Sequence, residues 1–257
     1  MPYRVAIIAA MEREVAPLIT GWRVREIEHS GRSYRLFENC ATENGRTVLV
    51  ISGMGAEAAR RATEAVIQVA RPMRVLSVGF AGALDPSLKI ADVVEFRVIV
   101  NAADGVRTES GSGEGTLVSY GAVASREQKE RLAKAYSGTA VDMEAAAVAQ
   151  GAQARGVEFA ALKAISDAAD FSMPPVERFV SGDGQFRSAG FALHVALRPW
   201  LWKRTIALAR NSARASRALC AAIIDYLETE RIRPAGRGAQ ADPPKKSLGG
   251  ASSVRVS

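Results

Sequence analysis

The sequence predicts an α/β protein whose mostly parallel sheet is covered by helices on both faces. Short apolar runs of strand length alternate with alanine-rich segments at helical spacing. Glycine-rich turns separate the two kinds of segment. With 257 residues, of which 48% are hydrophobic, the chain can bury one core of ordinary size. We expect one domain over residues 1–232 and a basic, disordered tail over residues 233–257.

The elements are expected in a simple alternating order. Apolar runs with β-branched residues predict strands at residues 5–10, 34–37, 46–51, 74–78, 92–100 and 159–165. Alanine and charged residues at helical spacing predict helices at residues 11–18, 56–69, 127–136, 144–155 and 205–230. Glycine and polar residues predict turns or loops at residues 52–55, 79–82, 102–115 and 168–187. Residues 117–119 and 122–124 are expected to form a short strand pair.

Composition and charge argue against several classes of function. The two cysteines, Cys40 and Cys220, form no CxxC pair and no cluster with histidine. This usage argues against a zinc site and for a reducing, cytoplasmic location. The net charge is +7, but residues 231–257 hold six basic residues and one acid, so this segment carries +5 and the remainder +2. We therefore expect no nucleic-acid partner for the folded domain.

Acidic residues follow short apolar segments at three points of the chain. Glu14 comes after the first run, Glu144 opens an alanine-rich helix just after Asp142, and Asp167 follows the run at residues 159–165. The carboxyl ends of parallel strands meet where open α/β sheets bind ligands. Together these acids predict acid/base chemistry on a neutral, hydroxyl-bearing substrate. Taken singly, each acid has a simpler interpretation as a helix or turn cap, and Asp142 competes with Glu144 for that role.

Five linked motifs resemble those of the nucleoside phosphorylase and nucleosidase superfamily, in particular the methylthioadenosine/adenosylhomocysteine nucleosidases. They are Ala9-Ala-Met-Glu-Arg-Glu-Val15, Ser52-Gly-Met-Gly55, Gly79-Phe-Ala-Gly-Ala-Leu84 with Leu88-Lys-Ile-Ala-Asp-Val-Val94, Val141-Asp-Met-Glu-Ala145 and Ala164-Ile-Ser-Asp-Ala-Ala-Asp170. The resemblance implies a three-layer α/β/α fold around a central mixed, partly barrel-like sheet. It also implies a homo-oligomer such as a dimer, a small-molecule nucleoside substrate, and no metal or organic cofactor.

The resemblance assigns roles to the three acids in cleavage of a purine N-glycosidic bond. Asp167, oriented by Ser166, would protonate the departing purine, which requires burial to raise the pKa of this carboxyl. Glu144 would bind the ribose 2′- and 3′-hydroxyls and favour the oxocarbenium-like transition state, with Met143 packed against the sugar. Glu14 would position and deprotonate the attacking water.

Several positions depart from the pattern of the relatives. Phe80 stands where relatives commonly have Ser or Thr, and Ser77 stands where phosphorylases place a phosphate-binding Arg; both favour water over phosphate as nucleophile. Lys163 replaces a frequent Arg, and Val123 and Ala124 replace an aromatic that covers the base. The expected substrate-binding residues are Glu144, Met143, Phe80, Gly82, Val123, Ala124 and Lys163.

The carboxyl-terminal part resembles a narrower branch, the hopanoid-associated phosphorylase-like proteins. The resemblance lies in Leu197-Arg-Pro-Trp-Leu-Trp202 and in residues 207–217. It implies an adenosine with a lipid tail, such as adenosylhopane, as substrate. Trp200 and Trp202 beside basic residues would suit peripheral contact with a membrane; plain helix packing is the simpler interpretation.

Three functions follow, in order of preference. The first is hydrolysis of an adenine nucleoside to free base. The second is a phosphate-dependent phosphorylase that yields ribose 1-phosphate. The third is a non-catalytic nucleoside-binding protein, against which the presence of all three acids argues.

Overall fold

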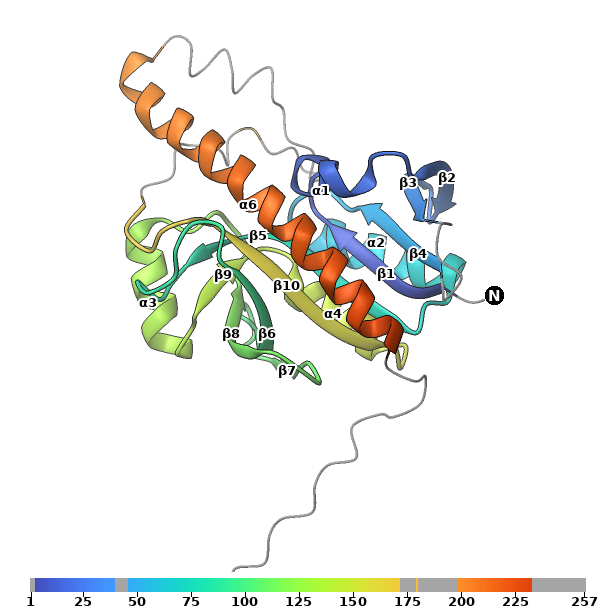
Figure 1. The fold of residues 1–257 in the computed structure, drawn as a ribbon. Coiled ribbons are helices and arrows are strands. Elements are labelled where there is room, and N and C mark those ends of the chain that lie inside the picture. The colour runs from blue at the N-terminus through green and yellow to red at the C-terminus, as the bar shows by residue number, and fades with distance from the viewer. Residues whose placement is uncertain (1–2, 40–45, 172–178, 180–197, 233–257) are drawn as a thin grey trace, which may run out of the picture.

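The computed structural model describes residues 3–39, 46–171, 179 and 198–232. The expected tail and most of the loop expected at residues 168–187 lie outside the described residues. Within that part, one mixed sheet runs through the molecule and helices pack on both of its faces (Figure 1). The three-layer α/β/α class is therefore confirmed.

Ten strands build the sheet. They are β1 (Tyr3–Ala9), β2 (Arg23–His29), β3 (Arg32–Asn39), β4 (Arg46–Ile51), β5 (Arg74–Ala83), β6 (Val93–Asn101), β7 (Arg107–Glu109), β8 (Glu114–Ser119), β9 (Ala140–Asp142) and β10 (Glu158–Asp167).

Part of the sheet closes on itself. Strand β5 pairs with β10 along one edge, and β10, β6, β8 and β9 follow in turn until β9 pairs with the end of β5. The first half of β5 also pairs with β1, which leads out to β4, β3 and β2. Among the described strands, five pairings are parallel and five antiparallel. The sheet is thus mixed and partly barrel-like, as the resemblance implies, and not mostly parallel.

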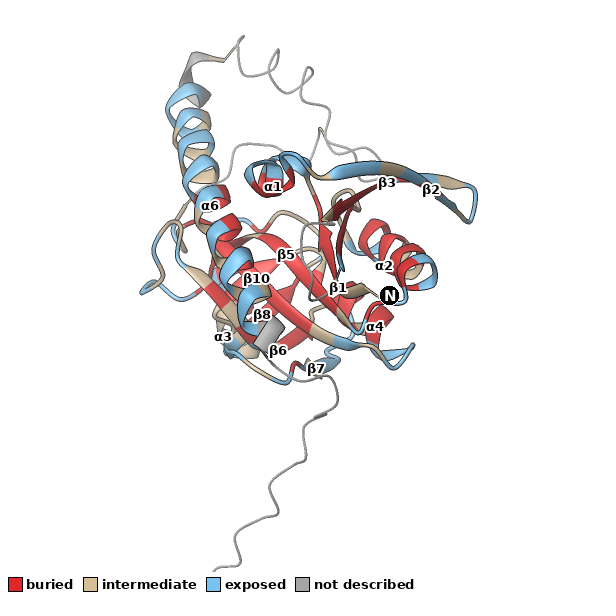
Figure 2. Ribbon diagram, turned by 45° about the vertical axis from the view of Figure 1, so that its right-hand side comes forward, coloured by how far each residue is buried: buried red, intermediate tan, exposed pale blue. Residues whose placement is uncertain are grey.

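Helices cover the two faces of the sheet. The helices are α1 (Glu12–Ile19), α2 (Ala56–Ala70), α3 (Arg126–Tyr136), α4 (Ala145–Gln153) and α6 (Pro199–Ile232). Helices α1 and α6 bury Val15, Leu219 and Ile223 against one face, and α2 and α4 bury Val66 and Val148 against the other. Figure 2 shows the buried strands between the two helical layers. None of the described helices is long and apolar enough to cross a membrane.

Several strands differ from the sequence-based expectation. The polar strand β2 lies at the sheet edge, where only Ile27 is buried, so its sequence lacks an apolar run. Strand β5 continues through Gly79 to Ala83 and includes the segment expected as a turn. Residues 122–124 form no strand, and β8 pairs with β6 and β9 instead. The short β7 lies inside the segment expected as a loop.

Candidate active site

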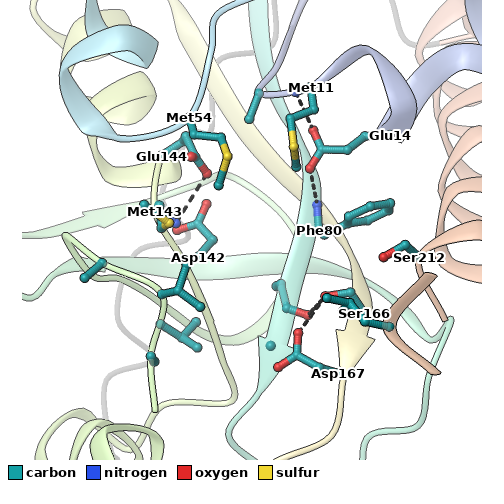
Figure 3. A pocket seen from close by; sticks show the side chains of 18 of the residues that line it. Met11, Glu14, Met54, Phe80, Asp142, Met143, Glu144, Ser166, Asp167 and Ser212 are labelled. Carbon is teal, nitrogen blue, oxygen red and sulfur yellow. Dashed lines mark hydrogen bonds between the residues drawn. The ribbon is translucent and has the colours of Figure 1, made fainter. Parts of the chain in front are cut away.

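A cavity lies at the carboxyl ends of β1, β5 and β10, beside the start of α4 and one face of α6 (Figure 3). Its volume is about 120 Å³, whereas small-molecule sites usually measure roughly 300–1,000 Å³. It shares Arg13, Phe80, Leu208 and Ser212 with a second cavity of about 580 Å³ between α1 and α6. Together the two cavities reach the usual size.

Nine of the ten residues selected from the sequence line the first cavity. They are Glu14, Phe80, Gly82, Val123, Ala124, Met143, Glu144, Ser166 and Asp167. Figure 3 shows Glu144 and Met143 across the cavity from Glu14 and Asp167. The fold therefore gathers residues that are up to 153 positions apart, from Glu14 to Asp167, although their roles remain predictions.

Glu14 lies in the first turn of α1 and its carboxyl group reaches β5. Oε2 accepts a hydrogen bond from the Met11 N–H at 3.0 Å, and Oε1 accepts one from the Phe80 N–H at 3.2 Å. Burial raises the pKa of Glu14 above its ordinary value, although the Met11 N–H and the charge of Lys163 act in the opposite direction. Glu14 is thus a buried carboxyl group that backbone donors hold in place, with a pKa above its ordinary value.

Glu144 lies at the N-cap position of α4 and faces the glycine turn after β4. Its Oε1 accepts a hydrogen bond from the Gly55 N–H at 2.7 Å, so this N–H serves the protein's own carboxyl group. The residue is only partly buried, but its carboxyl group is withdrawn from water. That withdrawal, together with the charge of Asp142, raises the pKa of Glu144 to about 7. The group can therefore change its charge near neutral pH.

Asp142 has a structural role that the sequence left open. Its Oδ2 accepts a hydrogen bond from the Ala145 N–H at 2.9 Å, so Asp142, and not Glu144, caps α4. The same oxygen lies 2.9 Å from the Nζ of Lys163, and both side chains are almost fully buried. Lys163 does not line the cavity, so the expectation that it contacts substrate finds no support in its position. Burial would lower the pKa of Lys163, but the charges of Asp142 and Glu144 raise it.

Asp167, at the end of β10, accepts hydrogen bonds on both carboxyl oxygens. The Ser166 hydroxyl donates to Oδ1 at 2.7 Å, which agrees with the expected orienting contact. The Nζ of Lys129 donates to Oδ2 and forms an ion pair there. Lys129 also donates to the carbonyl of Ala168 at 2.8 Å.

Lys129 is the functional candidate that sequence reasoning missed. On α3 only Lys129 and Leu132 are buried, and the Lys129 side chain is 3% exposed. A lysine on a highly charged helix is usually solvated, so its residue type gave no signal. Its position three residues before Leu132, on the apolar face of the helix, was the available clue.

The described residues contain no group of His, Cys, Asp and Glu side chains that could hold a metal ion. The cavity lining offers carboxyl groups, the ammonium of Lys129, the guanidinium of Arg13 and backbone N–H donors. Such a set suits proton transfer and the stabilisation of positive charge on a bound sugar.

Comparisons with known proteins agree with this fold. The family model of the phosphorylase superfamily matches residues 4–116 and 103–192. A 5′-methylthioadenosine/S-adenosylhomocysteine nucleosidase of Actinobacillus succinogenes is 30% identical over 204 residues, 65% of this chain and 86% of that protein.

Two solved structures from Helicobacter pylori share the fold. A 5′-methylthioadenosine/S-adenosylhomocysteine nucleosidase has a TM-score of 0.67 at 22% identity, over 88% of this chain and 98% of that one. A futalosine hydrolase has a TM-score of 0.63 at 22% identity, over 87% and 98%. From the matched family model and the relative at 30% identity, it follows that this chain belongs to the phosphorylase superfamily.

Proposed function

We propose that the protein is an N-glycosidase that uses water to release the base, adenine by preference, from a purine nucleoside. The observation that carries the proposal is that Glu14, Glu144 and Asp167 line one cavity. The names of the nucleosidase relatives support the same reaction class. No cofactor takes part in the proposed reaction.

Each carboxyl group has one task in the proposed mechanism. Glu144 accepts hydrogen bonds from the vicinal hydroxyls of the ribose, and its negative charge stabilises the oxocarbenium-like sugar. Glu14 orients a water molecule and takes its proton as the water attacks the sugar carbon. Asp167 is the group through which the departing base acquires a proton, because a purine leaves poorly as an anion.

The test is base release from adenine nucleosides in phosphate-free buffer, followed by chromatography. Asp167→Asn and Glu14→Gln should each lower kcat by roughly 100-fold or more, the usual size of an acid/base contribution. Glu12→Gln is the matched control, because Glu12 is an exposed acid on the same helix as Glu14. Full activity in both site variants would remove the mechanism.

Water is proposed as nucleophile, rather than phosphate, because the position of the phosphate-binding arginine of phosphorylases offers no cation here. Ser77, which occupies the position of the phosphorylase arginine, is 1% exposed and lies outside the cavity lining. The ammonium of Lys163 is paired with Asp142. Turnover that strictly requires added phosphate would favour the phosphorylase instead. Adenine binding without cleavage of any nucleoside would favour a non-catalytic binding protein.

The 5′ substituent of the nucleoside is proposed to be apolar, and a lipid tail such as that of adenosylhopane fits this class. The second cavity supports this, because Ala16, Pro17, Leu208, Ala209 and Ala213 contribute much of its lining. For 5′-alkylthioadenosines of increasing chain length, each buried methylene should make the binding free energy more favourable by about 0.8 kcal/mol. KM should therefore fall roughly fourfold for each methylene added. A KM that rises with chain length would contradict the proposal.

Peripheral membrane contact and a dimeric state are proposed from the sequence and its family resemblance, and one observation of the structure supports the membrane contact. Trp202 and Ile206 on α6 are 48% and 50% exposed, beside the basic residues Lys203 and Arg204. This pattern supports contact with an anionic lipid surface. Co-sedimentation with vesicles of anionic phospholipid tests the membrane contact.

The oligomeric state is tested separately, by sedimentation of the protein alone. A cytoplasmic location likewise remains a prediction.

A further inference from the structure

We infer that Lys129 is a positioning residue for Asp167 that also supplies the proton which Asp167 passes to the departing purine. The inference rests on the proposed function and adds a residue to its mechanism. It starts from the cluster that Lys129, Asp167, Ser166 and Gly82 form in the cavity wall.

The hydrogen bonds of Asp167 show where the proton is held. Oδ1 accepts from Ser166 and Oδ2 accepts from Lys129, so Asp167 donates no hydrogen bond in this arrangement. A carboxylic acid has one O–H donor, whereas an ammonium group has three N–H donors. We therefore place the transferable proton of this pair on the Nζ of Lys129.

The surroundings of Lys129 are built to hold this pair. Its Nζ has partners in Asp167 and the Ala168 carbonyl, which accounts for two of its three N–H donors. Gly82 leaves space for the pair, because a Cβ there would lie 2.8 Å from Asp167 Oδ2 and 3.2 Å from Lys129 Nζ. The lysine is thus fixed by contacts from β10 and β5 while it still borders the cavity.

The Ser166 hydroxyl can adjust its hydrogen bonds when Asp167 gains or loses a proton. Its hydroxyl has a second acceptor, the Ala81 carbonyl, at 3.4 Å. When Asp167 gains a proton, Ser166 can turn its O–H towards Ala81 and accept a hydrogen bond from Asp167 in return. The observed geometry therefore accommodates both the charged and the neutral form of Asp167.

The proposed step balances protons and electrons. As the bond between sugar and purine breaks, its electron pair stays with the purine, and a purine ring nitrogen takes a proton from Asp167. Lys129 gives one proton to Asp167 and becomes a neutral amine, while Glu14 takes a proton from the attacking water. After the products leave, solvent carries a proton from Glu14 back to Lys129. The other charged residues that line the cavity are Arg13, Asp142 and Glu144.

Lys129→Gln is the decisive variant. The glutamine amide keeps a hydrogen-bond donor for Asp167 but has no proton to transfer. Each variant is assayed on a purine nucleoside and on 4-nitrophenyl riboside, whose leaving group departs without protonation. We expect kcat on the purine nucleoside to fall by roughly 100-fold or more, and kcat on the nitrophenyl riboside to change by less than about threefold. The exposed residue Lys134 on the same helix supplies the control Lys134→Gln.

A further measurement keeps the test decisive. Thermal unfolding of each variant identifies any loss of structure, and Lys129→Met replaces Lys129→Gln if the latter fails to fold. Equal losses on both substrates, or unchanged purine cleavage, would overturn the inference. A native protein that releases no base from any nucleoside would instead overturn the proposed function.

Discussion

At the scale of single residues, burial and mutual repulsion set the properties of the acids. The Glu144 carboxyl lies close to Asp142 and is withdrawn from water, which raises its pKa from 4.5 to about 7. Only the ionised form can accept hydrogen bonds from both ribose hydroxyls without donating one. Activity should therefore depend on pH in the neutral range.

The expected result is that kcat/KM rises as pH increases through about 7, because Glu144 must lose its proton before it binds the diol. The raised pKa also means that Glu144 favours the folded state fully below pH 4.5, and that this contribution is lost as pH rises through about 7. Steady-state kinetics from pH 5 to 9 on the native protein and on Glu144→Gln test the assignment. A rise that persists unchanged in Glu144→Gln would assign it to another group, such as Glu14.

The acids were predictable from the sequence, but their polar partners were not. Glu14, Glu144 and Asp167 each follow an apolar run, and the carboxyl ends of strands meet at one place. Lys129 joins the site from a helix whose other charged residues face solvent, a contact that depends on how α3 packs. Lys163 was assigned to substrate because relatives often have Arg at this position, and its ion pair with Asp142 depends on how the strands are arranged.

At the scale of elements, the start of α3 determines where Lys129 lies. The Ser125 hydroxyl accepts a hydrogen bond from the Gln128 N–H, and the Gln128 side chain accepts one from the Ser125 N–H. Ser125 and Gln128 have the spacing that a capping box requires. Lys129 follows immediately, within the first turn of the helix.

Replacing Ser125 by alanine should lower the free energy of unfolding by about 1 kcal/mol, the usual effect of a lost N-cap. It should also lower kcat on purine nucleosides, because a frayed first turn loosens Lys129. Denaturant unfolding and steady-state kinetics measure the two effects. Thr20→Ala serves as a control, since Thr20 is exposed at the end of α1. An unchanged unfolding midpoint in Ser125→Ala would contradict the expectation.

The strands were predictable to different degrees for one physical reason. Buried strands such as β1 and β4 are continuous apolar runs, and their sequence alone identifies them. The edge strand β2 is mostly exposed and so lacks that pattern. The sequence-based prediction ended β5 before Gly79 because glycine is typical of turns. In the structure Gly79 lies within the strand, and its lack of a side chain leaves room for the Glu14 carboxyl group.

At the scale of the whole molecule, the ion pair of Lys163 and Asp142 joins two strands that are not neighbours. Lys163 lies on β10 and Asp142 on β9, and both strands pair with β5. Removing one partner of such a pair leaves a buried charge without compensation, whereas removing both does not. The pair therefore couples the closure of the sheet to the start of α4.

Lys163→Met should lower the free energy of unfolding by about 3–5 kcal/mol. The double variant Lys163→Met with Asp142→Asn should lose less free energy of unfolding than the two single variants together, because no buried charge is left without a partner. Denaturant unfolding of the four proteins gives the coupling energy. Additive losses would show that the two residues act independently.

The closed ring of β5, β10, β6, β8 and β9 has an evolutionary consequence. Asp167 and Phe80 belong to strands that are hydrogen-bonded to neighbouring strands within that ring. Neither strand can shift its register without breaking the hydrogen bonds of several neighbours. The far end of the pocket, by contrast, is bounded by side chains of α1 and α6, which can be exchanged one at a time. If the proposed function holds, related proteins can therefore differ in the 5′ substituent that they accept while they keep the same residues for bond cleavage.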